Sequence, residues 1–92
     1  MAHKMVVRRT FAEFVAGLRL DDVLYGWAVE PEGHDNYIVN LNGFNVLAYS
    51  KTNLSPGMKI QARVNALQPQ VELIIVAENE TIGKMERIDR AV

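Results

Sequence analysis

Few residues in this chain could carry out chemistry. The 92 residues include no cysteine and only two histidines, His3 and His34, so disulfides and thiolate metal sites are excluded. The densest titratable group is the stretch EPEGHD, which gathers Glu30, Glu32, His34 and Asp35 in one polar segment. Oxygen and imidazole ligands at this density can hold a metal ion or exchange protons, but the composition is typical of a solvated turn. We therefore predict no metal site and no cofactor.

The remaining motifs of catalysis are missing from the sequence. It contains no HExxH pair, no nucleophile elbow and no phosphate-binding loop of the Walker type. The paired carboxylates Asp21 and Asp22 would need a cleft to act as an acid–base pair, and the sequence indicates none. We expect a protein that is not an enzyme.

Charge and hydropathy limit the classes of partner. The net charge is −1 and the isoelectric point is about 6.1, so no overall field draws the chain to nucleic acid or anionic membrane. The longest apolar runs are too short to span a bilayer. The N-terminal residues lack the apolar stretch and cleavage site of a secretion signal. We expect a cytoplasmic protein with no membrane partner.

The N-terminal part has the pattern of a short helix over residues 10–19. Thr10 and Glu13 have the spacing of a capping box, in which each side chain accepts a hydrogen bond from the other residue's backbone N–H. Four apolar residues behind them follow helical spacing along one face: Phe11, Phe14, Val15 and Leu18. We expect this helix to pack on a sheet, with a partner-binding helix as the alternative.

A hairpin is the most specific β signal. Asn42-Gly43 separates the alternating runs YIVNL and FNVLAYS, and this dipeptide favours a type I′ turn because both of its positions need positive φ. A two-residue turn determines the pairing of the flanking strands. The pairs on the core face are then Tyr37–Ala48, Val39–Val46 and Leu41–Phe44, and those on the outer face are Ile38–Leu47 and Asn40–Asn45.

Further strands are predicted over residues 22–30, 58–66 and 71–78. In the first, Val23, Tyr25, Trp27 and Val29 share one face, and Gly26 marks a place where the strand can bend or bulge. The last segment, residues 79–92, is predicted as a helix. Its apolar residues have helical spacing, and Glu80–Lys84 and Glu86–Arg90 are favourable i,i+4 pairs.

These elements predict an all-β, β-rich α+β fold in one domain, residues 1–92. A flat sheet of five short strands would leave edges and an apolar face exposed, whereas a small coiled barrel removes both problems. We expect a five-stranded OB-like Greek-key barrel over residues 22–78, with the helix 10–19 before it and the helix 79–92 after it. A meander packed on two helices is the alternative.

The spacing over residues 24–77 resembles two known families. The pattern GWAV, YIVNLNGFNVLAYS, LSPGMKIQARV and LQPQVELII is similar to the small OB-like domains of flagellar hook-length control proteins and related secretion components. That resemblance implies an adaptor role in a bacterial flagellar or secretion setting. A weaker similarity is to the RNA-binding OB domains repeated in the largest small-subunit ribosomal protein. It implies aromatic residues at the nucleic-acid surface, at the positions of Tyr37 and Phe44.

Binding of single-stranded RNA or DNA is the alternative function. OB barrels stack bases on aromatic side chains inside a basic groove, and the candidate residues here are Tyr25, Trp27, Lys51, Lys59 and Arg63. The hairpin register, however, turns Tyr37 and Phe44 into the core. Residues 22–78 also contain three basic against six acidic residues. With no accessible aromatic platform, we expect oligonucleotide affinity of about 10⁻⁴ M or weaker.

Protein binding is the function that the sequence favours. Ile38 and Leu47 are predicted on the outer face beside Tyr49, where they would form an apolar patch with an aromatic rim unless a helix covers them. We therefore expect a non-catalytic adaptor that binds a protein partner or a second copy of itself through Ile38, Leu47 and Tyr49.

Overall fold

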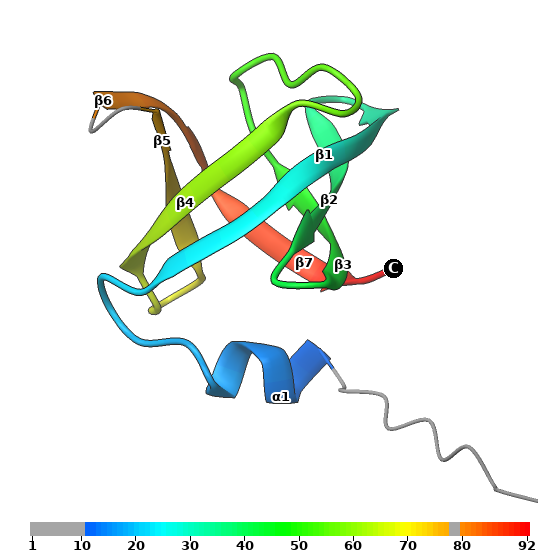
Figure 1. Cartoon of the computed structure of the whole chain (residues 1–92). Coiled ribbons are helices and arrows are strands. Elements are labelled where there is room, and N and C mark those ends of the chain that lie inside the picture. The colour runs from blue at the N-terminus through cyan, green and yellow to red at the C-terminus, as the bar shows by residue number, and fades with distance from the viewer. Residues whose placement is uncertain (1–10, 78–79) are drawn as a thin grey trace, which may run out of the picture.

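The protein is a β-rich domain, described here by a computed structural model over residues 11–77 and 80–92. Within these residues one short helix precedes seven antiparallel strands, which form a single sheet of order β6-β5-β4-β1-β2-β3-β7 (Figure 1). The elements are α1 (Phe11–Ala16), β1 (Val23–Gly33), β2 (Asn36–Leu41), β3 (Phe44–Tyr49), β4 (Lys59–Ala66), β5 (Glu72–Ala77), β6 (Glu80–Met85) and β7 (Arg87–Ala91). The expected all-β class is confirmed.

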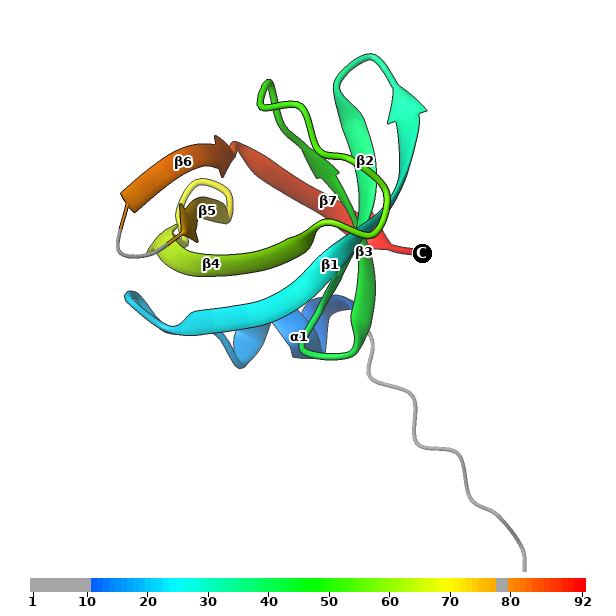
Figure 2. The ribbon, with the colours of Figure 1, turned by 45° about the horizontal axis from the view of Figure 1, so that its top comes forward.

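The sheet is strongly coiled, and its two edge strands are neighbours in the chain (Figure 2). Only Glu86 separates β6 from β7. At this residue the chain changes from pairing with β5 to pairing with β3. The Glu86 N–H donates to the carbonyl oxygen of Tyr49 at 2.8 Å, and the side-chain amide of Gln70 donates to the Glu86 carbonyl at 3.0 Å. These bonds hold the corner at which the two edge strands, β6 and β7, meet.

The predicted five-stranded barrel and C-terminal helix are both wrong. The helix was expected over residues 79–92, but residues 80–85 pair with β5 and residues 87–91 pair with β3. Without this segment, β3 and β5 would each leave a row of unpaired backbone N–H and C=O groups at the edge of the sheet. Residues 80–91 form strands because they hydrogen-bond to both rows. Local helical pairs such as Glu80–Lys84 contribute only tenths of a kcal/mol and are overridden.

The helix α1 covers one end of the core. Phe14 and Leu18 are buried, and the Phe14 ring stacks on Phe44 with 4.9 Å between centroids. The expectation that this helix packs on the sheet is confirmed, although it ends at Ala16 and not at residue 19. Thr10 of the predicted capping box lies outside the described residues, as does His3.

The hairpin register is confirmed pair by pair. Leu41 opposes Phe44, and the other four predicted pairs follow along β2 and β3. Asn42 and Gly43 have φ of 51° and 85°, as a type I′ turn requires. A local turn therefore determines which residues of both strands enter the core.

Strand β1 is shared between the two halves of the sheet. Residues 23–27 pair with β4, and residues 26–33 pair with β2 through a bulge after Ala28. Gly26 belongs to both ladders, and a Cβ placed on it would lie 1.5 Å from the carbonyl oxygen of Asn40. The position therefore requires glycine because β1 and β2 approach too closely there for any side chain.

Candidate binding face on β1 and β4

The most prominent surface feature is a row of large apolar side chains on the outside of β1. Val23, Tyr25 and Trp27 alternate along the strand with the inward-facing Leu24, and Tyr25 and Trp27 are 61% and 48% exposed. The sequence predicted that these residues share a face. The structure adds that this face is turned to solvent, which contradicts the expectation that no aromatic platform is accessible.

Polar and basic residues of β4 lie directly across from this row. Strand pairing places Arg63 opposite Val23, Gln61 opposite Tyr25 and Lys59 opposite Trp27. All three β4 side chains are exposed, because the alternate residues Ile60, Ala62 and Val64 are buried. We call these six outward residues of β1 and β4 the aromatic face: Val23, Tyr25, Trp27, Lys59, Gln61 and Arg63.

The hairpin turn holds the middle of the aromatic face in place. The Tyr25 N–H donates to the Asn42 side-chain oxygen at 3.0 Å, and the Asn42 N–H donates to the Tyr25 carbonyl at 2.7 Å. Asn40, opposite Trp27, donates to the Asn45 side chain at 2.8 Å and accepts from the Gly43 N–H. The Asn42-Gly43 dipeptide predicted the turn from sequence, but the contact of Asn42 with β1 was not predicted.

The charges of the aromatic face are uncompensated. It contains two cations and no carboxylate, and neither Lys59 nor Arg63 forms an ion pair with any residue that the structure describes. The third basic candidate from the sequence, Lys51, is exposed in the connection between β3 and β4 and does not lie on either strand of this face. The predicted nucleic-acid residues thus converge except for Lys51.

The residues predicted to bind protein do not form an open apolar patch. Ile38 is only 8% exposed, and Leu47 opposite it and Tyr49 are half-buried. Strand β7 lies beside them, with Arg90 paired to Leu47 and the Arg87 guanidinium 4.7 Å from the centroid of the Tyr49 ring. Of the two alternatives that the sequence left open, an open patch and a covered one, the low exposure of Ile38 favours the covered one, although the segment predicted as a covering helix is a strand that pairs with β3.

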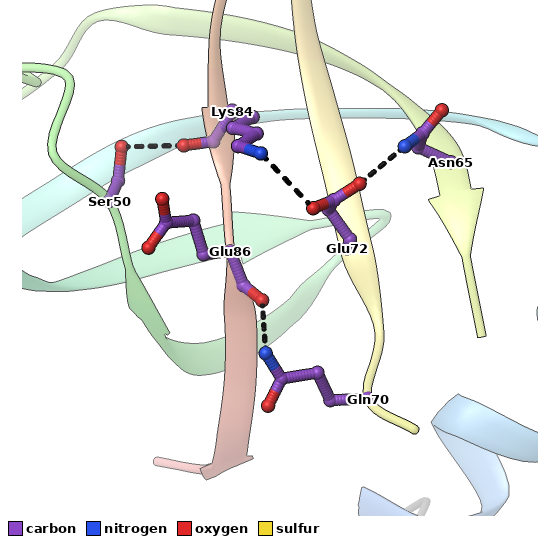
Figure 3. Close-up of polar contacts among 6 residues, drawn as sticks. All are labelled: Ser50, Asn65, Gln70, Glu72, Lys84 and Glu86. Atoms are coloured by element: carbon purple, nitrogen blue, oxygen red, sulfur yellow. Dashed lines mark hydrogen bonds and ion pairs between the residues drawn. The ribbon is translucent and has the colours of Figure 1, made fainter. Parts of the chain in front are cut away.

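A polar cluster surrounds the β6–β7 corner (Figure 3). The buried Ser50 hydroxyl donates to the Lys84 carbonyl at 3.0 Å, and the Lys84 ammonium lies 3.3 Å from Glu72. The Asn65 amide also donates to Glu72, and together with Lys84 it lowers the pKa of that carboxyl. Asn65, Glu72 and Lys84 join β4, β5 and β6, and Ser50 joins the segment after β3 to β6, so the contacts of this cluster hold strands together.

A cavity lies between α1, the β2–β3 turn and the C-terminal residues. It measures about 780 Å³ and is lined by both apolar side chains, such as Phe14 and Phe44, and polar ones, such as Asn42 and Asn45. Asp22 is the one carboxylate in its lining, and its side chain accepts a hydrogen bond from the Arg19 N–H at 2.9 Å. A lone engaged carboxylate offers no acid–base pair for catalysis.

Within residues 11–77 and 80–92, no group of three or more histidine, aspartate or glutamate side chains is arranged to hold a metal ion. Glu30, Glu32, His34 and Asp35 are all exposed at the β1–β2 connection. In the same part of the chain, no helix has the length and apolar character needed to cross a membrane.

Comparison with known proteins leaves the surface geometry as the main evidence about function. No family model, no curated protein and no solved structure matches this chain.

Proposed function

We propose that this chain is a non-catalytic binding module and that single-stranded RNA or DNA binds its aromatic face. The observation that carries this proposal is the exposure of Tyr25 and Trp27 side by side on β1, with Lys59 and Arg63 on the neighbouring strand. Exposed aromatic rings beside unpaired cations are the two components of surfaces that bind single strands.

The aromatic spacing suits consecutive bases. Tyr25 and Trp27 are two residues apart on an extended strand, so their Cα atoms are separated by about 7 Å. Each ring can stack on one base, and such stacking contributes about 1–3 kcal/mol per base without depending on sequence. Stacking therefore supplies affinity that the small number of cations would not.

The cations lie where phosphates would pass. Lys59 and Arg63 are four residues apart on β4, about 13 Å along the strand. A strand stacked on β1 would bring its backbone beside this row, and each phosphate contact would release counterions. Gln61 lies between the two cations, opposite Tyr25, where its amide can hydrogen-bond to a base or a sugar.

A protein partner is the second candidate for this face. Tryptophan, tyrosine and arginine are the residues that most often dominate the energy of protein interfaces, and Trp27, Tyr25 and Arg63 are all present here. The net charge of −1 also favours it over nucleic acid. The family resemblance supports a flagellar or secretion setting for this module, and the lack of a secretion-signal pattern supports a cytoplasmic location.

The test uses the single tryptophan of the chain as the reporter. Titration with a short oligothymidylate should quench Trp27 fluorescence with a dissociation constant of roughly 10⁻⁵ M at low salt, because two stacked bases add to two phosphate contacts. The logarithm of the association constant should fall against the logarithm of salt with a slope of about −1.4, two contacts at about −0.7 each.

Variants locate the binding surface. Tyr25→Ala and Lys59→Glu should each weaken binding at least about fivefold, while Lys51→Glu, the same charge change outside the aromatic face, should have a smaller effect. Equal effects of Lys59→Glu and Lys51→Glu would contradict binding at this face. Absence of quenching up to about 1 mM oligonucleotide with a folded protein would overturn the nucleic-acid assignment in favour of the protein partner.

A further inference from the structure

A second charged surface lies at the end of the β1–β2 hairpin. Residues 30–33 of β1 pair only with β2, and this hairpin projects beyond the rest of the sheet (Figure 2). Its end carries the exposed carboxylates Glu30, Glu32 and Asp35, which we call the acidic tip. None of the three forms an ion pair with any other part of the described chain.

The acidic tip has a defined shape. Gly33, His34 and Asp35 have φ of 83°, 53° and 62°. The Asn36 side-chain amide donates to the carbonyl oxygens of Gly33 and His34 at 3.2 and 3.3 Å. Glu30 and Glu32 thus stand on strand β1 and Asp35 on the ordered turn that ends it, so docking them would require little further loss of backbone entropy.

The charges of the acidic tip and the aromatic face are complementary. The tip has three carboxylates and no cation, and the face has Lys59 and Arg63 and no carboxylate. Both surfaces belong to β1, with Trp27 and Glu30 only three residues apart on one strand. Within one copy, no ion pair joins the tip to the face among the residues that the structure describes, so the cations of the face are available to a second copy.

We propose that the acidic tip of one copy docks on the aromatic face of a second copy. Glu30 and Glu32 then meet Lys59 and Arg63, and the exposed Pro31 between the two glutamates packs its ring on the aromatic side chains, as prolines do in aromatic-lined grooves. Every copy has both surfaces, so a two-fold arrangement places two such contacts in one dimer.

This association would also regulate the face. Carboxylates of a second copy occupy the place that phosphates would take, so self-association and oligonucleotide binding exclude one another. That consequence rests on the proposed function, whereas the docking of two copies does not.

The test exchanges charges between the two surfaces. One variant reverses the face (Lys59→Glu with Arg63→Glu), and the other reverses the tip (Glu30→Lys with Glu32→Lys). All four positions are exposed, so both variants should fold, which circular dichroism checks. By sedimentation velocity at low salt, the unmodified protein should show a concentration-dependent dimer, and each variant alone should dimerise at least about tenfold more weakly.

Mixing the two variants is the decisive step. A reversed face then meets a reversed tip, and the other two surfaces are still complementary, so the mixture should regain the dimer while each component alone does not. Failure of the mixture to associate more strongly than its components overturns the proposal. An unmodified protein that stays monomeric to about 1 mM at low salt overturns it as well.

The outcome is separable from that of the oligonucleotide titration. Dimer formation restored by mixing, together with no oligonucleotide binding, would support self-association and reject nucleic-acid binding. Oligonucleotide binding with no restored dimer would do the opposite. If both occur, added oligothymidylate should shift the dimer of the unmodified protein toward monomer.

Discussion

Two pairs of aromatic residues lie on three adjacent strands of this sheet and have opposite surroundings. On the β2–β3 hairpin Tyr37 is buried and Phe44 packs against the core, whereas on β1 Tyr25 and Trp27 are exposed. The alternation of side chains along a strand, with the hairpin register, places the two residues of each pair on one face of the sheet. It does not decide which face is inside. The inner side of β1 carries Leu24, Gly26 and Ala28, and at Gly26 the close approach of β1 and β2 leaves no room for a ring.

The comparison assigns the two pairs to different tasks. The hairpin aromatics contribute stability by removing apolar area from water, about 25 cal/mol for each Å². The β1 aromatics leave much of their area in water, and exposed apolar patches of this kind mark interaction surfaces. Substitutions that separate stability from binding should therefore distinguish the two regions.

The largest effect is expected from Gly26→Ala, which affects the β1–β2 contact on which both regions depend. The new Cβ would lie 1.5 Å from the Asn40 carbonyl oxygen, a backbone atom that moves only if the two strands separate. The free energy of unfolding, measured by urea denaturation, should fall by at least about 3 kcal/mol.

The same substitution at Gly17 is a matched control. A Cβ there would meet its nearest neighbour, the Glu13 carbonyl oxygen, at an ordinary 3.6 Å, so Gly17→Ala should leave stability unchanged or slightly raised. A tolerated Gly26→Ala would show that the crowding of β1 does not explain why its aromatics face outward.

The second prediction compares one tyrosine from each region. Tyr37→Ala should lower the free energy of unfolding by about 3 kcal/mol, because it empties a site in the core. Tyr25→Ala should lower it by less than about 1 kcal/mol, while it weakens oligonucleotide binding. Thermal or urea denaturation of both variants checks the contrast. Equal losses of stability would mean that the outer row is part of the fold's support and not a free binding surface.

The smallest of the three effects is expected at the hairpin turn. Gly43→Val should destabilise the protein by at least about 1 kcal/mol, because a β-branched residue resists the φ of 85° found there. No atom lies within 4 Å of the added Cβ, so the loss would come from the backbone and not from a clash. The Asn42 contact with Tyr25 should loosen too, and a change in Trp27 fluorescence in the folded variant would report it. An unchanged urea midpoint would reject the type I′ argument.

The candidate site was only partly predictable. Four of its residues were identified from sequence as Tyr25, Trp27, Lys59 and Arg63, because their types suit stacking and phosphate contact. Their assembly into one exposed face depends on the pairing of β1 with β4, whose partners are about 36 residues apart in the chain. Whether Ile38 and Leu47 are open or covered could not be decided for the same reason, since strand β7, which pairs with β3 beside Leu47, comes from the far end of the sequence.

The sequence by itself determined the features that depend on interactions between residues close together in the chain. The Asn42-Gly43 turn needs positive φ at both residues, and this set the hairpin register, the Asn40–Asn45 pair and the burial of Tyr37. Tertiary structure alone decided the inner side of β1 and the conformation of residues 80–91. The first depends on how closely β1 and β2 approach at Gly26. The second depends on which strand edges remain unpaired once the chain has coiled, because unpaired backbone groups outweigh the weak helical preferences of that segment.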